Sequence, residues 1–284
     1  MTFRNPSNRL LGYPDDARLL IVNADDLGVC HAVNDAVFDA LPHRFLRSTS
    51  LMMPCLGAME AVHFLQQFPQ YPFGIHLTAI CDNENNCFAP LLPREQVPSL
   101  VQENGLFFYF DDMQHFLTNV NLNEMEAEFR TQIEAVFAAG LRPTHLDWHS
   151  LRIDNRMDTF ELMFRLAREY RLALRVFGQG PIQKLSSLGL PCVDGNFLDS
   201  YQLKASSKPE VFARLMRELP EGLSEWAIHP GLDSAELDRI EPTGNHVRQT
   251  DYEFIISPYA HELIQKEGII LMDYRALQSI WNNI

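Results

Sequence analysis

Short apolar segments alternate with longer segments of helical periodicity along most of the chain. The apolar segments have the length of buried strands, and in the longer ones apolar residues recur every three or four positions. This alternation favours parallel strands that are joined by helices. The predicted strands are Arg18–Asn23, Ser48–Met53, Phe73–Leu77, Thr144–Trp148, Ala173–Phe177, Cys192–Asn196, Glu225–Ile228 and Ile269–Asp273.

The clearest predicted helix runs from about residue 123 to residue 140. Met125, Phe129 and Ile133 place an apolar residue on one face at every turn. Asn123 is a suitable N-cap and Gly140 a suitable stop. Further helices are predicted at Ala32–Leu41, Ala58–Phe68, Met157–Tyr170, Lys208–Leu219 and Pro258–Lys266.

Seven or eight such strands in 284 residues predict an α/β fold, a distorted (β/α) barrel that forms a single domain over residues 1–284. An open dinucleotide-binding sheet is disfavoured because no GxGxxG motif follows the first strand. The stretch 78–121 interrupts the alternation and is rich in Asn, Asp, Pro and aromatic residues. We expect it to be an insertion over one end of the barrel, where substrate-covering loops lie.

Composition narrows the choice of partner and compartment. With 23 Lys and Arg against 37 Asp and Glu, the formal charge of −14 disfavours nucleic acid and anionic lipid as partners. No apolar run is long enough to span a bilayer, and the first sixteen residues show no signal-peptide core. The five cysteines form no CxxC pair, so we expect free thiols in a reducing cytoplasm, with Cys81 and Cys87 as two separate thiols even though they could meet in a loop.

Ionisable residues gather where four of the predicted strands end. The first strand is followed by Asp25 and Asp26, the third ends in His76, and the seventh is followed by His229. In a (β/α) barrel the active site lies at the carboxyl ends of the strands. Each feature alone has a structural explanation, as a helix cap, a hydrogen-bonded histidine or a turn. Their joint placement at four strand ends favours a functional site.

The fourth predicted strand carries a geometric argument of its own. Side chains alternate between faces, so His145, Asp147 and His149 share one face, and Leu146 and Trp148 are expected to pack outwards against helices. Three ionisable groups inside a barrel need a ligand, a network or water. One carboxylate and two imidazoles from different strands suit a divalent ion with positions open for water and substrate.

Together these segments resemble the YdjC-like carbohydrate deacetylases, a family that includes chito-oligosaccharide deacetylase. The family's first motif, N-A-D-D-F-G, appears as Asn23-Ala24-Asp25-Asp26-Leu27-Gly28. A Gly-Ile-His triplet follows at 74–76, the sequence P-T-H-L-D-W-H at 143–149 and a late His-Pro at 229–230. The motifs occur in the family's order over about residues 19–275.

The resemblance implies a distorted (β/α) barrel that binds one divalent metal ion, Mg²⁺ or Zn²⁺. Its ligands would be Asp26, His76 and His149, while Asp25 would be the general base and His229 the general acid. Arg175 stands where similar proteins also carry arginine, which implies a supporting role. His145 and Asp147 are placed to orient His149 or a neighbouring group.

The sequence departs from the family directly after the third implied ligand. Typical members continue this motif as H-H-H-V-H, whereas here Ser150, Leu151 and Arg152 follow. Trp148 fills a position that is often small, and we assign it to the substrate-binding surface. The motifs therefore predict the reaction type better than the sugar.

The resulting hypothesis is a metal-dependent hydrolase that removes acetyl groups from N-acetylated sugars. Metal-activated water would attack the amide, Asp25 would take its proton and His229 would protonate the leaving amine. The alternatives are another metallohydrolase on the same scaffold, such as a phosphoesterase or another amidase, and a carbohydrate-binding barrel without catalysis. The expected partner is a small carbohydrate, and a homodimer is left open.

Overall fold

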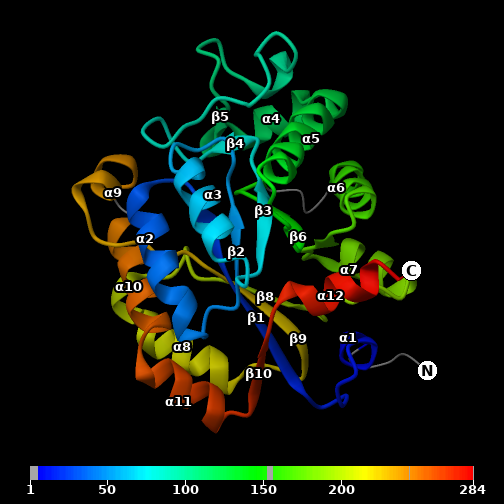
Figure 1. Cartoon of the computed structure of the whole chain (residues 1–284), viewed down its shortest axis with the longest axis vertical. Helices are drawn as coiled ribbons and strands as arrows, with labels where there is room; N and C mark the ends of the chain where they lie inside the picture. The colour runs from blue at the N-terminus through cyan, green and yellow to red at the C-terminus, as the bar shows by residue number, and fades with distance from the viewer. Residues whose placement is uncertain (1–5, 152–155, 243, 284) are drawn as a thin grey trace.

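Strands and helices alternate along the chain in the computed structural model, which describes residues 6–151, 156–242 and 244–283 (Figure 1). The strands are β1 (Arg18–Leu27), β2 (Ser48–Leu51), β3 (Phe73–Leu77), β4 (Ile80–Cys81), β5 (Phe108–Tyr109), β6 (His145–Trp148), β7 (Ala173–Leu174), β8 (Asn196–Asp199), β9 (Gly222–Ile228) and β10 (Ile269–Met272). The helices are α1 (Pro6–Leu10), α2 (His31–Ala40), α3 (Ala58–Gln67), α4 (Met113–Asn119), α5 (Leu122–Ala138), α6 (Met157–Glu169), α7 (Gln179–Ser187), α8 (Lys208–Arg217), α9 (Ala235–Ile240), α10 (Asn245–Ile255), α11 (Pro258–Lys266) and α12 (Tyr274–Trp281).

The main sheet is entirely parallel, and its strands run in the order β7-β6-β3-β2-β1-β9-β8. β10 joins it by pairing with the first half of β1, whereas β2 pairs with the second half. Among the described residues, β7 and β8 end the sheet and form no ladder with each other, so the barrel is distorted and open. The predicted fold class, an α/β barrel of parallel strands, is confirmed.

β1 lies at the centre of this sheet and determines where the site forms. All of its residues after Arg18 are buried, because β9 lies on one side and β10 and β2 on the other. Its carboxyl end therefore opens into the middle of the barrel rather than onto an edge. Polar side chains at that end are withdrawn from solvent and must find partners inside the molecule.

The structure corrects two predicted boundaries. The strand predicted at Cys192–Asn196 is wrong, because β8 runs over Asn196–Asp199 and the preceding residues approach the sheet as irregular chain. The helix predicted from residue 123 is α5, but its N-cap is Asn121, whose side chain accepts a hydrogen bond from the backbone of Asn123. Gly140 ends the helical segment as predicted, with a φ of +79° that favours glycine.

The predicted insertion carries β4, β5 and α4 and protrudes at one end of the molecule (Figure 1). β4 and β5 pair with each other in a separate small sheet. Cys81 and Cys87 are joined by a disulfide bond, so the prediction of two separate thiols is wrong for this pair. The chain between them folds back on itself, with Asn83 bridged to Asn86, and this brings the two Cα atoms to 4.8 Å.

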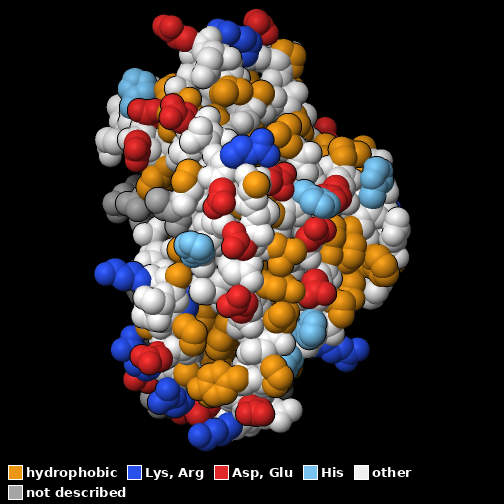
Figure 2. Space-filling model, turned by 90° about the vertical axis from the view of Figure 1, so that its left-hand side faces the viewer, with side chains coloured by type: hydrophobic (Ala, Val, Ile, Leu, Met, Phe, Trp, Pro, Cys, Tyr) orange, Lys and Arg blue, Asp and Glu red, His pale blue; other side chains and the backbone are white. Residues whose placement is uncertain are grey.

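The surface reflects the acidic composition. On the face shown in Figure 2, acidic and apolar side chains are mixed over the middle of the molecule, while most Lys and Arg lie towards its lower end. None of the helices in the described part of the chain combines the length and the apolar character needed to cross a membrane.

Candidate metal centre and active site

Asp25 and Asp26 are adjacent in sequence, yet both side chains line the same cavity. Strict alternation along a strand would direct them to opposite faces. The register between β1 and β2 shifts between Ala24 and Leu27, and Asp26 adopts a positive φ of 67°. This β-bulge turns both carboxylates inwards.

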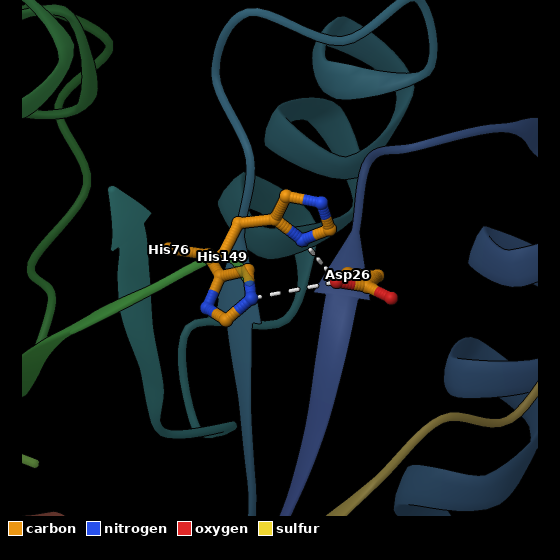
Figure 3. A group of neighbouring side chains, drawn as sticks. All are labelled: Asp26, His76 and His149. Carbon is orange, nitrogen blue, oxygen red and sulfur yellow. Dashed lines mark hydrogen bonds and ion pairs between the residues drawn. The ribbon is translucent and has the colours of Figure 1, made fainter. Parts of the chain in front are cut away.

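His76, His149 and Asp26 converge on one point (Figure 3). His76 is contributed by β3, and His149 follows β6, the strand next to it in the sheet. Oδ1 of Asp26 lies 3.4 Å from Nε2 of His76 and 3.1 Å from Nδ1 of His149. All three side chains are buried, and one ligand atom of each lies within 4.8 Å of the other two.

Asp147 contacts the far side of the His76 ring. The two residues are register partners on β6 and β3, and Oδ1 of Asp147 lies 2.9 Å from Nδ1 of His76. Burial alone would lower the pKa of His76, but Asp147 and the carboxylates of β1 outweigh it and raise the pKa to about 9. Asp147 therefore fixes His76 rather than His149.

His145 is fully buried at the start of β6. Its ring stacks on Tyr274 of α12, with ring centroids 3.7 Å apart. A Cβ atom at position 74 would lie 2.4 Å from the His145 ring, which explains why glycine precedes Ile75 and His76 in the third strand. His145 thus supports the floor of the site.

Arg175 holds Asp25 in a bidentate ion pair. Its Nη1 and Nη2 donate to the two carboxylate oxygens at 2.6 and 2.8 Å, and Asn23 adds a third hydrogen bond at 2.7 Å. Burial alone would raise the pKa of Asp25, but Arg175 and His76 outweigh it and lower the pKa. Asp25 is therefore ionised near neutral pH. Nε of Arg175 donates to Glu225 at 2.7 Å.

Arg248 is a site residue that the sequence analysis did not find. It projects from α10, donates to Oδ2 of Asp26 at 2.8 Å and is itself held by Glu241. Burial opposes ionisation of Asp26, but Arg248 and the two imidazoles outweigh it and lower its pKa well below the usual range. α10 buries Asn245, Arg248 and Asp251 on its inner face, so a search for apolar periodicity overlooks it.

His229 follows β9 and lines the same cavity as Asp25 and Asp26. Its backbone N–H donates to Oδ2 of Asp251 at 3.0 Å, and Oγ of Ser200 lies 3.5 Å from its Nδ1. Asp251 is paired in turn with the buried Lys208, at 2.6 Å. These contacts fix the backbone at His229 and so position its side chain.

The cavity has a volume of about 340 Å³. One side is lined by a run of aromatic rings, which we call the aromatic wall: Trp148, Phe177 and Phe197. The ring centroids lie 5.3 Å apart for the first pair and 5.1 Å for the second. The prediction that Trp148 packs outwards is wrong, because this last residue of β6 lines the cavity and packs against Phe177. The wall bridges the open side between β7 and β8.

The donor set at Asp26, His76 and His149 fits a divalent cation. Two imidazole nitrogens and one carboxylate oxygen face one point, and the carboxylates around them supply compensating charge. A second group, Asp25, His76 and Asp147, overlaps the first through His76. The first group contains the three ligands that the motifs imply.

Comparisons with known proteins decide the family. A model of the YdjC-like protein family matches residues 19–266. This chain belongs to the YdjC-like family. A carbohydrate deacetylase of Geobacillus stearothermophilus is 32% identical over 262 residues, which are 91% of this chain and 97% of the relative. A chitooligosaccharide deacetylase of Serratia marcescens is 26% identical, over 92% of this chain and 99% of the relative.

Solved structures support the same relationship. A protein of Enterococcus faecalis V583, provisionally assigned to cellobiose-phosphate cleavage, superposes on this YdjC-like chain with a TM-score of 0.76. The two are 27% identical, and the match covers 92% of this chain and 99% of the other. The resemblance drawn from the motifs is confirmed at the level of the family and its fold.

Proposed function

We propose that this chain is a metal-dependent carbohydrate deacetylase that removes acetyl groups from N-acetylated sugars. The observation that carries the proposal is the convergence of Asp26, His76 and His149 in a cavity that also holds Asp25 and His229. The names of the relatives point to the same activity, since carbohydrate and chitooligosaccharide deacetylases match over their full lengths.

One divalent ion held by Asp26, His76 and His149 would polarise the acetyl carbonyl and acidify a water molecule. Two imidazoles among three ligands favour Zn²⁺ over Mg²⁺, which prefers oxygen donors. Asp25, kept ionised by Arg175, would take the proton of the attacking water. His229, on the same cavity, would give a proton to the sugar amine as it leaves.

The aromatic wall supports a carbohydrate as the substrate. Phe177 and Phe197 present ring surfaces in the cavity, against which the apolar face of a sugar ring can pack. Asp199 and Gln202 line the same cavity and are exposed, so they are available to sugar hydroxyl groups. A site of this kind combines one apolar surface with a few polar groups that fix orientation.

The test is release of acetate from N-acetylglucosamine oligomers. We expect release by the metal-loaded protein, loss of release with a chelator and recovery when Zn²⁺ is restored. Asp26→Asn is the matched variant, since it removes one ligand charge with little change in shape. Acetate release that is unchanged by the chelator and equally fast in Asp26→Asn would rule out the proposed mechanism.

A further inference from the structure

We infer that Asp82, in the insertion after β3, positions His149 for metal binding. Asp82 forms a close ion-pair contact with the Nε2 side of the His149 ring, which leaves Nδ1 for the ion. The inference rests on the proposed metal site and assigns to it a residue outside the family motifs quoted above. It also gives the insertion a role in the metal centre itself.

The geometry places one carboxylate on each nitrogen of the His149 ring. Oδ1 of Asp82 lies 3.0 Å from Nε2, and Oδ1 of Asp26 lies 3.1 Å from Nδ1. Figure 3 shows one nitrogen of the ring directed at Asp26 and the other directed away from it. Asp82 therefore lies across the ring from the metal ligands and is not placed as a fourth ligand.

His76 shows the same arrangement with its nitrogens exchanged. Its Nδ1 faces Asp147 at 2.9 Å, and its Nε2 faces Asp26 at 3.4 Å. A metal-binding histidine commonly donates its second N–H to a carboxylate, which fixes the ring and raises its basicity as a ligand. Asp147 does this for His76 through a hydrogen bond. Asp82 lies at the equivalent place beside His149, at ion-pair distance.

Asp82 is itself held by neighbours. Nδ2 of Asn86 donates to its Oδ2 at 2.9 Å, and Oγ of Ser150 donates to its Oδ1 at 3.3 Å. The disulfide between Cys81 and Cys87 closes the short loop that carries Asp82 and Asn86. Ser150 belongs to the segment in which this chain departs from the typical family motif, so the departure adds a contact to Asp82.

A metal-binding measurement tests this role. Zn²⁺ affinity is measured by equilibrium dialysis on full-length Asp82→Ala, with Glu84→Gln as the matched control, because Glu84 is an exposed carboxylate of the same loop. We expect Asp82→Ala to weaken binding about 10- to 100-fold and Glu84→Gln to bind like the wild type. Asp82→Asn, which keeps an acceptor oxygen but no charge, should fall between. Equal affinities in all four proteins would overturn the inference.

The nitrogen that binds the ion gives a second readout, which needs no variant and no activity. In ¹⁵N spectra of the Zn²⁺-loaded wild type, His149 should show a metal-bound Nδ1 and a protonated Nε2, and His76 the reverse. A metal-bound Nε2 on His149 would overturn the role of Asp82 while leaving the proposed function intact. A wild type that binds no divalent ion would overturn both.

Discussion

Arg248 donates to Oδ2 of Asp26 at 2.8 Å, while Oδ1 of the same carboxylate faces the imidazoles of His76 and His149. Asp26 thus has one oxygen occupied by the protein and one directed to the proposed metal. Arg248 is fixed by Glu241, which also accepts hydrogen bonds from Tyr201 and Asn86. This network sets the orientation of Asp26 before any ligand binds.

Removal of Arg248 should destabilise the metal-free protein strongly. Arg248→Met leaves the buried carboxylates of Asp26 and Glu241 without their cation, a change that typically costs about 3–5 kcal/mol. Urea denaturation of the metal-free protein measures this loss in the free energy of unfolding. Arg275→Gln, which removes a largely exposed guanidinium from its pair with Asp273, should cost less than about 1 kcal/mol. Similar losses in the two variants would contradict the role of Arg248.

Asp25 and His149 should separate catalysis from metal binding. Asp25→Asn removes the proposed base but no metal ligand, so we expect metal to be retained and turnover to fall about 10²- to 10⁴-fold. His149→Ala removes a proposed ligand, so we expect both metal binding and turnover to be lost. Bound metal and acetate release are measured on the same samples. Equal loss of metal in the two variants would speak against these roles.

Glu225 should make stability depend on pH. Burial raises its pKa to about 7, from 4.5 for an unperturbed glutamate, although Arg175 opposes the shift. A raised folded-state pKa gives stability that is present below pH 4.5 and lost as the pH rises through about 7. Glutamine cannot ionise, so the free energy of unfolding of Glu225→Gln should not fall with pH in this way. Between pH 4.5 and about 7, the variant should become more stable relative to the wild type by up to roughly 3 kcal/mol. Urea unfolding at a series of pH values measures both free energies. The same dependence on pH in the wild type and in Glu225→Gln would refute this prediction.

The aromatic wall should govern substrate affinity more than rate. Phe177→Ala removes a ring surface of the cavity lining that packs against Trp148 and Phe197 and carries no proposed reacting group. We therefore expect KM for N-acetylated oligomers to rise several-fold and kcat to change little. Steady-state kinetics measure both constants. Phe68→Ala, at a partly exposed helix end outside the cavity, is the control and should leave KM unchanged.

Much of the fold and of the site could be predicted because each depends on local pattern. β3 is a short apolar run broken by His76, whereas polar and apolar residues alternate along β6. This alternation already placed Asp147 on one face with His149, which follows the strand. Parallel strands bring their carboxyl ends together, so residues far apart in sequence could be assigned to one site.

The rest depends on contacts that no local pattern reveals. Arg248 lies on a helix that buries three polar residues beside two apolar ones. Asp82 reaches His149 from an insertion without regular periodicity. Asp25 and Asp26 face the same way because of a bulge, which alternation alone does not foresee. The disulfide at Cys81 depends on how one loop folds back.

The central claim is that Asp26, His76 and His149 hold one ion on which deacetylation depends. Its most direct test is to strip the protein of metal, titrate Zn²⁺ back and follow bound metal and acetate release together. We predict that both rise in proportion and saturate at one ion per chain. Activity that survives stripping, or that requires a second ion for each chain, would contradict the account.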